Sequence, residues 1–326
     1  MIAPSPMPSV TRVPVPGLGP EDPVIAADGT VYAALRDEGR LLRVRPGAER
    51  AEVVTDIGGR GLGCELLADG RVLVCNADLG LQAVDPETGA VETLLAGADD
   101  APFVLCNNAS VARDGTVYLS ESSRAYDLGA FRRDVVEDTR TGRLMRWRPG
   151  SAPETLLPDT LLGGLGFANG VALSPDEDFV LVAETAHRRI HRVWLMGARA
   201  GEAEAFAEVP GYPDNLGVGE TPGPDGEPLY WCAVPALPAP ALSRIHAMPR
   251  PLRRLIARVP ERLGPQAPDC CRVAAFDAGG RLVHLLDGDP ARYRYVTGVR
   301  ERGGRVWMGS IHEEALAWFD LPGGQP

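Results

Sequence analysis

The sequence lacks the basic excess that a general nucleic-acid binder requires. Its 326 residues carry 33 basic and 44 acidic side chains, which gives a net charge of -11. Because such a binder must displace the counterions of the phosphate backbone with basic side chains, we do not expect a nucleic-acid partner. Hydrophobic residues at 44% and charged residues at 24% are ordinary for a soluble globular chain, so disorder is not indicated.

The sequence also lacks a long apolar run. No stretch approaches the about 18 consecutive apolar residues that a membrane-spanning helix needs. Residues 1–23 have no basic region followed by a continuous apolar one, and their prolines oppose a helix. We therefore expect a cytoplasmic protein with no membrane span. Because large all-β folds commonly form one unit at this length, residues 1–326 are expected to be a single domain.

No cysteine pair has the spacing of a zinc site or of a disulfide framework. The six cysteines are scattered along the chain, and only Cys270 and Cys271 are adjacent. They are expected to be buried, reduced thiols that act as small hydrophobic side chains.

What the sequence does contain is a repeat. A turn, usually Asp-Gly, followed by two or three β-forming residues recurs along the chain. Its copies have their turns at residues 28, 69, 114, 176, 225 and 303. The shortest spacings, 41 and 45 residues, match a four-stranded propeller blade of about 40–50 residues. Further strand pairs follow these turns, so the sequence predicts an all-β fold, a six-bladed β-propeller with short antiparallel strands.

Two insertions interrupt the repeat. The longest gap holds the one stretch with helical periodicity, at about residues 242–263. Its apolar residues at helical spacing are Leu252, Leu255, Ile256 and Val259. We expect a short helix packed over one mouth of the propeller with its arginines in solvent, and the alternative is a basic amphipathic helix on a membrane surface. The other insertion, residues 122–144, mixes aromatic and charged residues and is a possible rim or lid.

The residues just ahead of the turns carry polar oxygen atoms. In a propeller the innermost strand of each blade starts near the central channel, so these residues converge on one axis. Glu21, Asn107 and Asn169 each stand seven residues ahead of their turn, and Asp214 and Asn215 precede the fifth turn. Carboxylate and amide oxygens without His or Cys suit calcium better than zinc or copper. The alternative interpretation is that these side chains only cap turns.

The pair Asn169-Gly170 shows this ambiguity within one blade. Asn-Gly is a strong hairpin signal, but the run that follows already contains a turn at residues 174–178. We therefore expect the Asn169 side chain to face a metal, and Gly170 to let the backbone come close to the axis.

Long collinear motifs carry a resemblance to a known family. They are GPED from Gly19, VLCNNASVARDGTVYLSESSRAYD from Val104, TGRLMRW from Thr141, FANGVALSPDEDFVLVAETAHRRIHRVWL from Phe167, GYPDN from Gly211 and GVRERGGRVWMGS from Gly298. Over nearly the whole chain, the sequence resembles the strictosidine synthase-like branch of the superfamily of calcium-dependent phosphotriesterases, gluconolactonases and paraoxonases. The resemblance implies the same six-bladed fold.

The resemblance also implies a metal site. In the calcium hydrolases of this superfamily, a Glu, two Asn and an Asp hold the catalytic metal at the channel mouth. The implied ligands of Ca²⁺ in this sequence are Glu21, Asn107, Asn169 and Asp214, with Asn215 as a possible further contact. Asp214 would then be both a ligand and the nucleophile or general base, and the metal a Lewis acid.

The resulting hypothesis is a calcium-dependent hydrolase, a lactonase or esterase, that acts on a small-molecule lactone, ester or related electrophile. His312 and His187 are further catalytic candidates as base or proton shuttle, with a surface or strand-pairing role as the alternative for each. We expect a monomer or a dimer.

Two alternatives from other classes remain open. One is a Pictet-Spengler-type cyclase or condensation enzyme of bacterial secondary metabolism that uses the same pocket. The glutamate with which strictosidine synthase works without this metal falls on Thr297 here, which argues against that alternative. The other is a non-catalytic propeller that binds a partner across its mouth.

Overall fold

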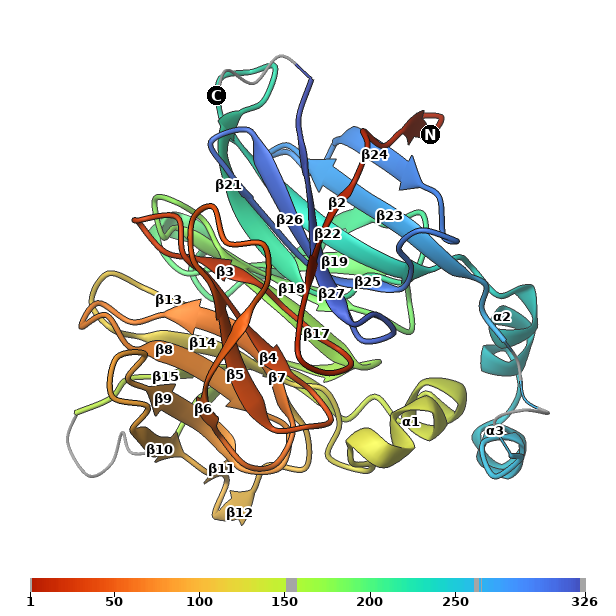
Figure 1. The fold of residues 1–326 in the computed structure, drawn as a ribbon. Helices are drawn as coiled ribbons and strands as arrows, with labels where there is room; N and C mark the ends of the chain where they lie inside the picture. The colour runs from red at the N-terminus through yellow and green to blue at the C-terminus, as the bar shows by residue number, and fades with distance from the viewer. Residues whose placement is uncertain (1, 151–156, 261–263, 265, 323–326) are drawn as a thin grey trace.

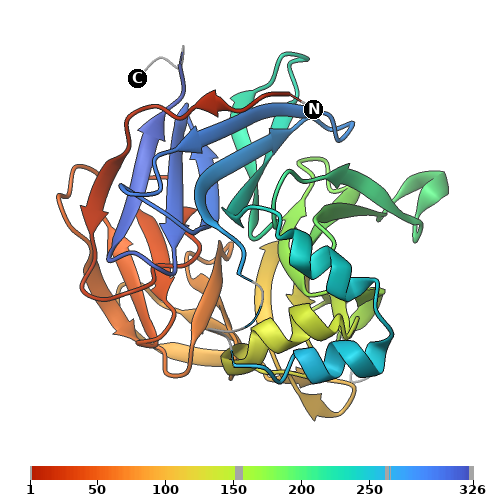
Figure 2. The same ribbon diagram turned by 90° about the vertical axis from the view of Figure 1, so that its right-hand side faces the viewer.

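The computed structural model describes residues 2–150, 157–260, 264 and 266–322. These residues form six blades placed radially around a central axis (Figures 1 and 2). The predicted six-bladed β-propeller is therefore confirmed. No helix in the described part of the chain is long and apolar enough to cross a membrane.

The first four blades follow the chain in order. Blade 1 consists of β3 (Val24–Ile25), β4 (Val31–Leu35), β5 (Arg40–Val44) and β6 (Glu52–Asp56). Blade 2 consists of β7 (Gly61–Leu66), β8 (Val72–Asn76), β9 (Gly80–Val84) and β10 (Val91–Leu95). Blade 3 consists of β13 (Cys106–Val111), β14 (Val117–Glu121), β15 (Gly142–Trp147) and β16 (Asp159–Leu165). Blade 4 consists of β17 (Ala168–Leu173), β18 (Phe179–Glu184), β19 (Arg189–Trp194) and β20 (Ala203–Glu208). A small hairpin of β11 (Gly97–Ala98) and β12 (Ala101–Pro102) lies between blades 2 and 3 in sequence.

The last two blades also take up the N-terminal strands. Blade 5 consists of β21 (Leu216–Pro222), β22 (Pro228–Ala236), β23 (Asp269–Phe276) and β24 (Leu282–Gly288), with β1 (Ser5–Pro6) added in parallel to β24. Blade 6 consists of β25 (Val296–Arg302), β26 (Arg305–Ser310), β27 (Ala315–Asp320) and β2 (Thr11–Pro14). The antiparallel pairing of β2 with β27 closes the ring between the two ends of the chain. The first strand of each blade lies at the axis, where neighbouring first strands such as β13 and β17 contact one another.

The predicted turns all connect the first and second strands of a blade. In blade 1 the Asp28 carboxylate accepts a hydrogen bond from Thr30 N at 2.9 Å, and Gly29 has a φ of +86°. Asp114 and Gly115 repeat this arrangement in blade 3. An aspartate that bonds the backbone two residues on, followed by a glycine in the left-handed region, explains why Asp-Gly marks these turns.

The hydrophobic core is divided among the contacts between neighbouring blades. Leu181 of blade 4 and Phe276 of blade 5, for example, belong to the same buried cluster. Because each blade is covered on both faces, its second strand is buried along its whole length, as β8 and β14 are. Such strands appear in the sequence as continuous apolar runs. The cysteines are all free and buried, as predicted.

The two insertions form a helical cap at one side of the propeller, as Figure 2 shows. The cap consists of α1 (Phe131–Glu137), α2 (Pro240–His246) and α3 (Arg250–Ile256), and α1 contacts both other helices. The 3-10 helix η1 (Leu128–Ala130) leads into α1, and η3 (Gly197–Arg199) lies in blade 4. The insertion at residues 122–144 therefore does contribute to a rim.

The single helix predicted at about residues 242–263 is wrong in two respects. The segment forms two helices, because prolines at residues 249 and 251 lack the N–H that a continuous helix needs. The predicted apolar stripe does not pack on the propeller, since Leu252, Leu255 and Val259 are 50%, 62% and 42% exposed. Residues 261–263, at the end of the prediction, lie outside the described residues.

Candidate metal centre and substrate cavity

Two inner strands carry matching β-bulges near the axis. In β13 the pairing moves from Cys106 opposite Glu121 to Ala109 opposite Leu119, so one extra residue lies on the inner strand. Strand β17 repeats the irregularity between Ala168 and Val171. A bulge takes its residues out of the regular ladder and re-aims their side chains. The bulged residues are Asn107 and Asn108 in β13, and Asn169 and Gly170 in β17.

Gly170 has no room for a side chain. A Cβ atom there would lie 2.3 Å from the Leu216 amide nitrogen, and Gly170 N is 3.3 Å from the carbonyl oxygen of Asp214. The Asn-Gly pair is therefore inside a strand, and the reversal falls at Ser174–Asp178, where Ser174 Oγ bonds the Asp178 carboxylate at 2.6 Å. The glycine permits the close approach of blades 4 and 5 at the axis.

The two bulge asparagines use their amide nitrogens and leave their oxygens free. Asn107 Nδ2 donates to Ser122 Oγ at 2.8 Å, and Asn169 Nδ2 donates to Thr185 Oγ1 at 3.2 Å. Both Oδ1 atoms are buried, and neither has a hydrogen-bond partner among the described residues. A buried polar atom without a partner costs about 1–3 kcal/mol, so two equivalent ones indicate a missing ligand.

Glu21 completes this set from blade 1. Its Oε1 accepts a hydrogen bond from Asn215 Nδ2 at 2.8 Å, while its buried Oε2 has no partner within the described ranges. Burial, followed by the charges of Asp214 and Asp22, holds the pKa of Glu21 well above its usual range. Burial likewise raises the pKa of Asp214 to about 8, although a hydrogen bond with Asn169 opposes the shift.

These atoms fit a calcium ion. Two carboxylates and two free amide oxygens form an all-oxygen set, and a bound cation would supply the positive charge that lets both carboxylates ionise. No group of three or more His, Cys, Asp or Glu side chains suited to a metal occurs in the described part of the chain, so this centre depends on its two asparagines. Glu21, Asn107, Asn169 and Asp214 are the residues that would hold the ion.

Asn215 is placed differently from these four. Its Nδ2 is bonded to Glu21, and its Oδ1 accepts a hydrogen bond from Asn108 Nδ2 at 2.9 Å. Both ends of the amide are thus used, so Asn215 supports the Glu21 carboxylate from behind.

A cavity of about 120 Å³ opens over Asn169 and Asp214. Apart from Arg132, Thr185 and these two residues, its walls are mostly apolar or aromatic, and α1 and α2 supply Phe131 and Leu242 among them. The remaining wall residues include Val135, Val136, Phe167, Tyr212, Ala236, Ala239 and Tyr295. The cap therefore forms one side of the chamber above the candidate metal centre.

Two aromatic wall residues have an unusual backbone. Phe167 and Tyr295 have φ values of 65° and 54° and stand directly before the inner strands β17 and β25. A left-handed conformation is rare for bulky residues, and it persists where the surrounding structure requires it, often at functional sites. Sequence reasoning missed both residues as wall residues, and the sequence contains no signal for positive φ at a non-glycine residue.

The two histidine candidates lie outside the residues that line this cavity. His312 Nδ1 is 3.3 Å from the Asp269 carboxylate, and its ring stacks on Tyr295 with 4.1 Å between centroids. His187 Nε2 is 2.9 Å from Asp138 Oδ1, at the C-terminal end of α1. His312 thus stands behind a wall residue, and His187 joins blade 4 to the cap.

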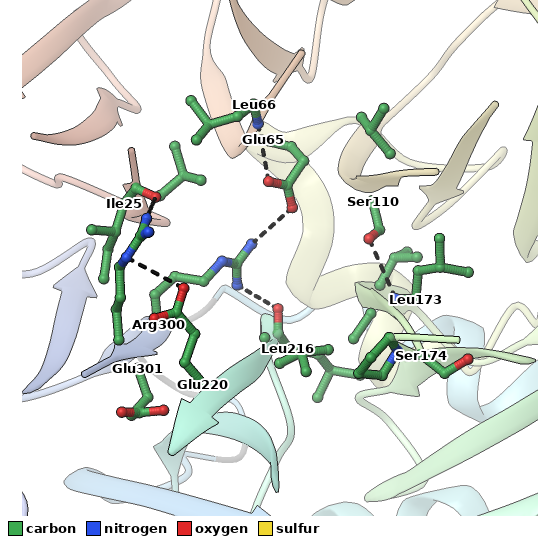
Figure 3. Close-up of a pocket in the computed structure, with 18 of the residues that line it drawn as sticks. Ile25, Glu65, Leu66, Ser110, Leu173, Ser174, Leu216, Glu220, Arg300 and Glu301 are labelled. Atoms are coloured by element: carbon green, nitrogen blue, oxygen red, sulfur yellow. Dashed lines mark hydrogen bonds and ion pairs between the residues drawn. The ribbon is translucent and has the colours of Figure 1, made fainter. Parts of the chain in front are cut away.

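Below the ligand set, a buried ionic network crosses the axis. Asn108 Nδ2 donates to Asp22 Oδ2 at 3.0 Å, and Arg300 Nη2 donates to the same oxygen at 3.2 Å. Burial raises the pKa of Asp22 to about 7 even though Arg300 opposes the shift. Arg300 also bonds the Leu216 carbonyl and lies 3.9 Å from Glu65 (Figure 3). Sequence reasoning did not single out Asp22, Asn108 or Arg300, although Asp22 and Asn108 directly follow predicted ligands.

Arg300 and Glu65 also line a second cavity, of about 320 Å³. Residues at the far ends of the inner strands surround it, including Ile25, Leu173 and Glu220 (Figure 3). The candidate metal centre and this cavity therefore lie toward opposite ends of the central channel, with the Arg300 network between them.

The fold defines a class of protein, the six-bladed β-propellers, and solved structures of this class superpose on the chain. A gluconolactonase from Xanthomonas campestris superposes with a TM-score of 0.68 at 16% identity and covers 96% of this chain and 89% of its own. The calcium-binding protein regucalcin from Agrobacterium tumefaciens gives a TM-score of 0.63 at 17% identity, over 95% of this chain and 93% of its own. At these identities the likeness is one of fold.

Sequence comparison identifies the family. The family models described as strictosidine synthase and as strictosidine synthase-like, N-terminal, match residues 107–198 and 7–44. Strictosidine synthase-like 10 from Arabidopsis thaliana is 31% identical over 288 residues, which span 85% of this chain and 73% of that protein. The chain belongs to the strictosidine synthase-like family, which confirms the resemblance described from its motifs.

Proposed function

We propose that this protein is a calcium-dependent hydrolase of a small lactone, ester or related electrophile. The observation that carries the proposal is the set of three buried oxygens without partners in the described residues, on Glu21, Asn107 and Asn169, beside the carboxyl group of Asp214. When bound there, calcium would polarise a substrate carbonyl and place it over the ligand set. The gluconolactonase and regucalcin likenesses of fold are consistent with this chemistry.

Asp214 is the residue proposed to act on the substrate. Of the two carboxylates in the ligand set, only Asp214 lines the cavity, and Glu21 does not. A calcium ion lowers the pKa of a bound water much less than zinc does, so a protein carboxylate must serve as nucleophile or general base. Asn169 lies in the same cavity floor, where its free Oδ1 would orient the ion.

The cavity walls favour a substrate with an apolar substituent. Phe131, Val136 and Leu242 offer no hydrogen-bonding groups, and the polar wall groups are few. Besides the floor residues they are Arg132, Thr185 and the hydroxyls of Tyr212 and Tyr295. A polyhydroxylated sugar lactone would lose more of its bonds to water against the apolar walls than these groups replace. An alkyl or aryl ester or lactone is therefore the proposed substrate class.

The family also includes synthases, so a condensation enzyme is the second candidate. Its support is the strictosidine synthase model that matches residues 107–198. Thr297, at the position of the synthase glutamate, is 1% exposed, and its hydroxyl donates to the Glu21 carbonyl at 3.1 Å. A buried hydroxyl engaged in this way offers no carboxylate for proton transfer, which is why hydrolysis is preferred.

The test combines metal binding with turnover. Calcium binding is measured by calorimetry on the chelator-treated protein, and hydrolysis on a panel of aryl esters and alkyl lactones. Asn169→Ala removes one free oxygen and is expected to weaken calcium binding about tenfold or more. Asp214→Asn keeps the shape but removes the reacting carboxylate, so turnover should fall by at least about 100-fold.

Asp114→Asn is the matched control, because Asp114 holds a turn of blade 3 far along the strand from Asn107. It should leave binding and turnover unchanged. Full turnover in both site variants with unaltered calcium content would reject the hydrolase proposal. Condensation of an amine with an aldehyde, without ester hydrolysis, would favour the second candidate.

A further inference from the structure

The α3 helix presents two of its apolar side chains to solvent. Leu252 and Leu255 are 50% and 62% exposed, and Val259, three residues after the end of the helix, is 42% exposed. The side that faces the protein carries the partly buried Ile256 and also Arg253, which is 14% exposed and bonds Asp138 at 2.7 Å. A surface helix normally buries its leucines and exposes its charges. Leucines exposed beside a buried arginine are the reverse of this, and exposed apolar side chains that gather on one face mark an interaction site.

Charge is also segregated across the cap. Three acidic residues lie in α1 or directly after it. They are Asp134, Glu137 and Asp138, whose exposed fractions are 0%, 2% and 3%. The described residues 240–260 contain no acidic residue, and their exposed arginines are Arg244, Arg250, Arg254 and Arg258. Arg250 and Arg254 share one carboxylate, Glu137, at 3.6 and 3.7 Å, so the four arginines exceed their acidic partners. The outer surface of these helices is therefore apolar and cationic on a protein whose net charge is -11.

We propose that the cap docks on the surface of an anionic lipid membrane through α3. An interfacial helix inserts its apolar side chains below the lipid headgroups while its cationic side chains contact those headgroups. Leucines flanked by arginines on the outer face of the cap match this arrangement. Because the net charge of the protein is -11, an anionic membrane repels the protein as a whole, which favours approach by this cationic face.

A second copy of the chain fits this surface less well. A symmetric contact would bring the same arginines of two protomers against each other, and like charges placed together in this way oppose association. A lipid surface has no such penalty. Docking would also bring the membrane next to a chamber that α1 and α2 line with apolar side chains.

Co-sedimentation of the full chain with vesicles tests the proposal. We expect binding to phosphatidylcholine vesicles that contain phosphatidylserine, little binding to phosphatidylcholine alone, and release at high salt. The double variant Leu252→Glu with Leu255→Glu should reduce binding at least about tenfold. Replacing Arg244 and Arg258 by Gln should weaken it about fivefold for each arginine, and these changes leave the ion pairs of Arg250 and Arg254 with Glu137 in place.

Met196→Glu is the matched control, because Met196 is 54% exposed but lies after β19, outside the cap. It should bind as the unaltered protein does. Failure of the unaltered protein to sediment with the anionic vesicles would overturn the proposal, as would sedimentation that the cap variants do not change. A dimer that is lost in the leucine variant, detected by light scattering, would also overturn it and assign the patch to a second copy.

Discussion

Replacing Arg300 by Met is predicted to cost about 3–5 kcal/mol of stability at neutral pH, because it breaks a buried ion pair and removes a buried hydrogen-bond donor from two acceptors. Arg300 donates to Asp22 Oδ2 at 3.2 Å and to the Leu216 carbonyl, and both acceptors lose this donor in the variant. Asp22 Oδ2 keeps its bond from Asn108 Nδ2, so the loss is one charge-assisted hydrogen bond at Asp22 and one at the Leu216 carbonyl. Hydrogen bonds to charged groups contribute about 1.5–3 kcal/mol each, and the two together give a similar figure. Methionine has a comparable length, which limits any cavity.

The pH dependence separates this reasoning from a simple packing defect. In the native protein, burial raises the pKa of Asp22 to about 7 and Arg300 lowers it. Without Arg300 this pKa rises further, so the variant must retain a proton that the native protein releases above pH 7. The destabilisation should therefore grow by up to about 1.4 kcal/mol for each pH unit above that point.

Urea unfolding of both proteins between about pH 6 and 9 measures this difference. Arg281→Met serves as the control, because Arg281 is 67% exposed and its pair with Asp277 should contribute no more than about 1 kcal/mol. A cost below about 1 kcal/mol for the Arg300 variant, or one that does not change with pH, would refute the argument.

The same variant should weaken calcium binding. Arg300 fixes Asp22, Asn108 bonds both Asp22 and Asn215, and Asn215 holds Glu21. Partners that orient metal ligands in this way typically contribute about 10–100-fold in metal affinity. Calorimetry on the folded variant measures the effect, and unchanged affinity would show that the ligand set is held independently of the network.

Three further predictions concern pH and packing. Because burial raises the pKa of Asp214 to about 8, the metal-free folded state binds more protons than the unfolded state, and its stability should fall as pH rises from about 4 to 8. Over the same range calcium should bind more tightly and should release protons on binding. Calorimetry in two buffers of different ionisation enthalpy detects the released protons. Burial raises the pKa of Glu184, but hydrogen bonds from His191, Arg189 and a backbone amide outweigh it and lower the pKa to about 2. Glu184→Gln should therefore be destabilising above about pH 5 and progressively less so as pH falls toward 2. A difference in stability that stays constant in acid denaturation curves would count against this. Gly170→Ala places a Cβ 2.3 Å from a backbone nitrogen and should cost at least about 1–3 kcal/mol, whereas Gly163→Ala, with its nearest atom at 3.8 Å, should be close to neutral in the same melting experiment.

The features that were predicted correctly depend on local rules. Asp-Gly turns can be recognised because the Asp28 side chain bonds the backbone two residues on and Gly29 accepts a positive φ. Their regular spacing then gives the blade repeat, and equal offsets from the turns give equivalent places at the axis. This is why Asn107 and Asn169, which stand in matching bulges, could be selected together from the sequence.

The features that were missed or wrong depend on contacts between distant segments. The direction in which α3 turns its leucines follows from the pairing of Arg253 with Asp138, which are 115 residues apart. Helical periodicity finds an apolar stripe but cannot say whether protein or solvent lies beside it. Likewise, the partner of Asp22 is Arg300 in the last blade, 278 residues away.

By itself, the sequence determined the architecture and pointed to the residues of the candidate site, because turns, strand periodicity and the oxygen-bearing residues at equivalent offsets are local properties of the chain. Only the tertiary structure decided how these parts act together. Closing the ring of blades buries Glu21, Asn169 and Asp214 in one small volume, and burial is what raises the pKa of both carboxyl groups and leaves the Asn169 oxygen without a partner. Desolvation depends on everything that surrounds a group, and no segment of the chain contains that information alone.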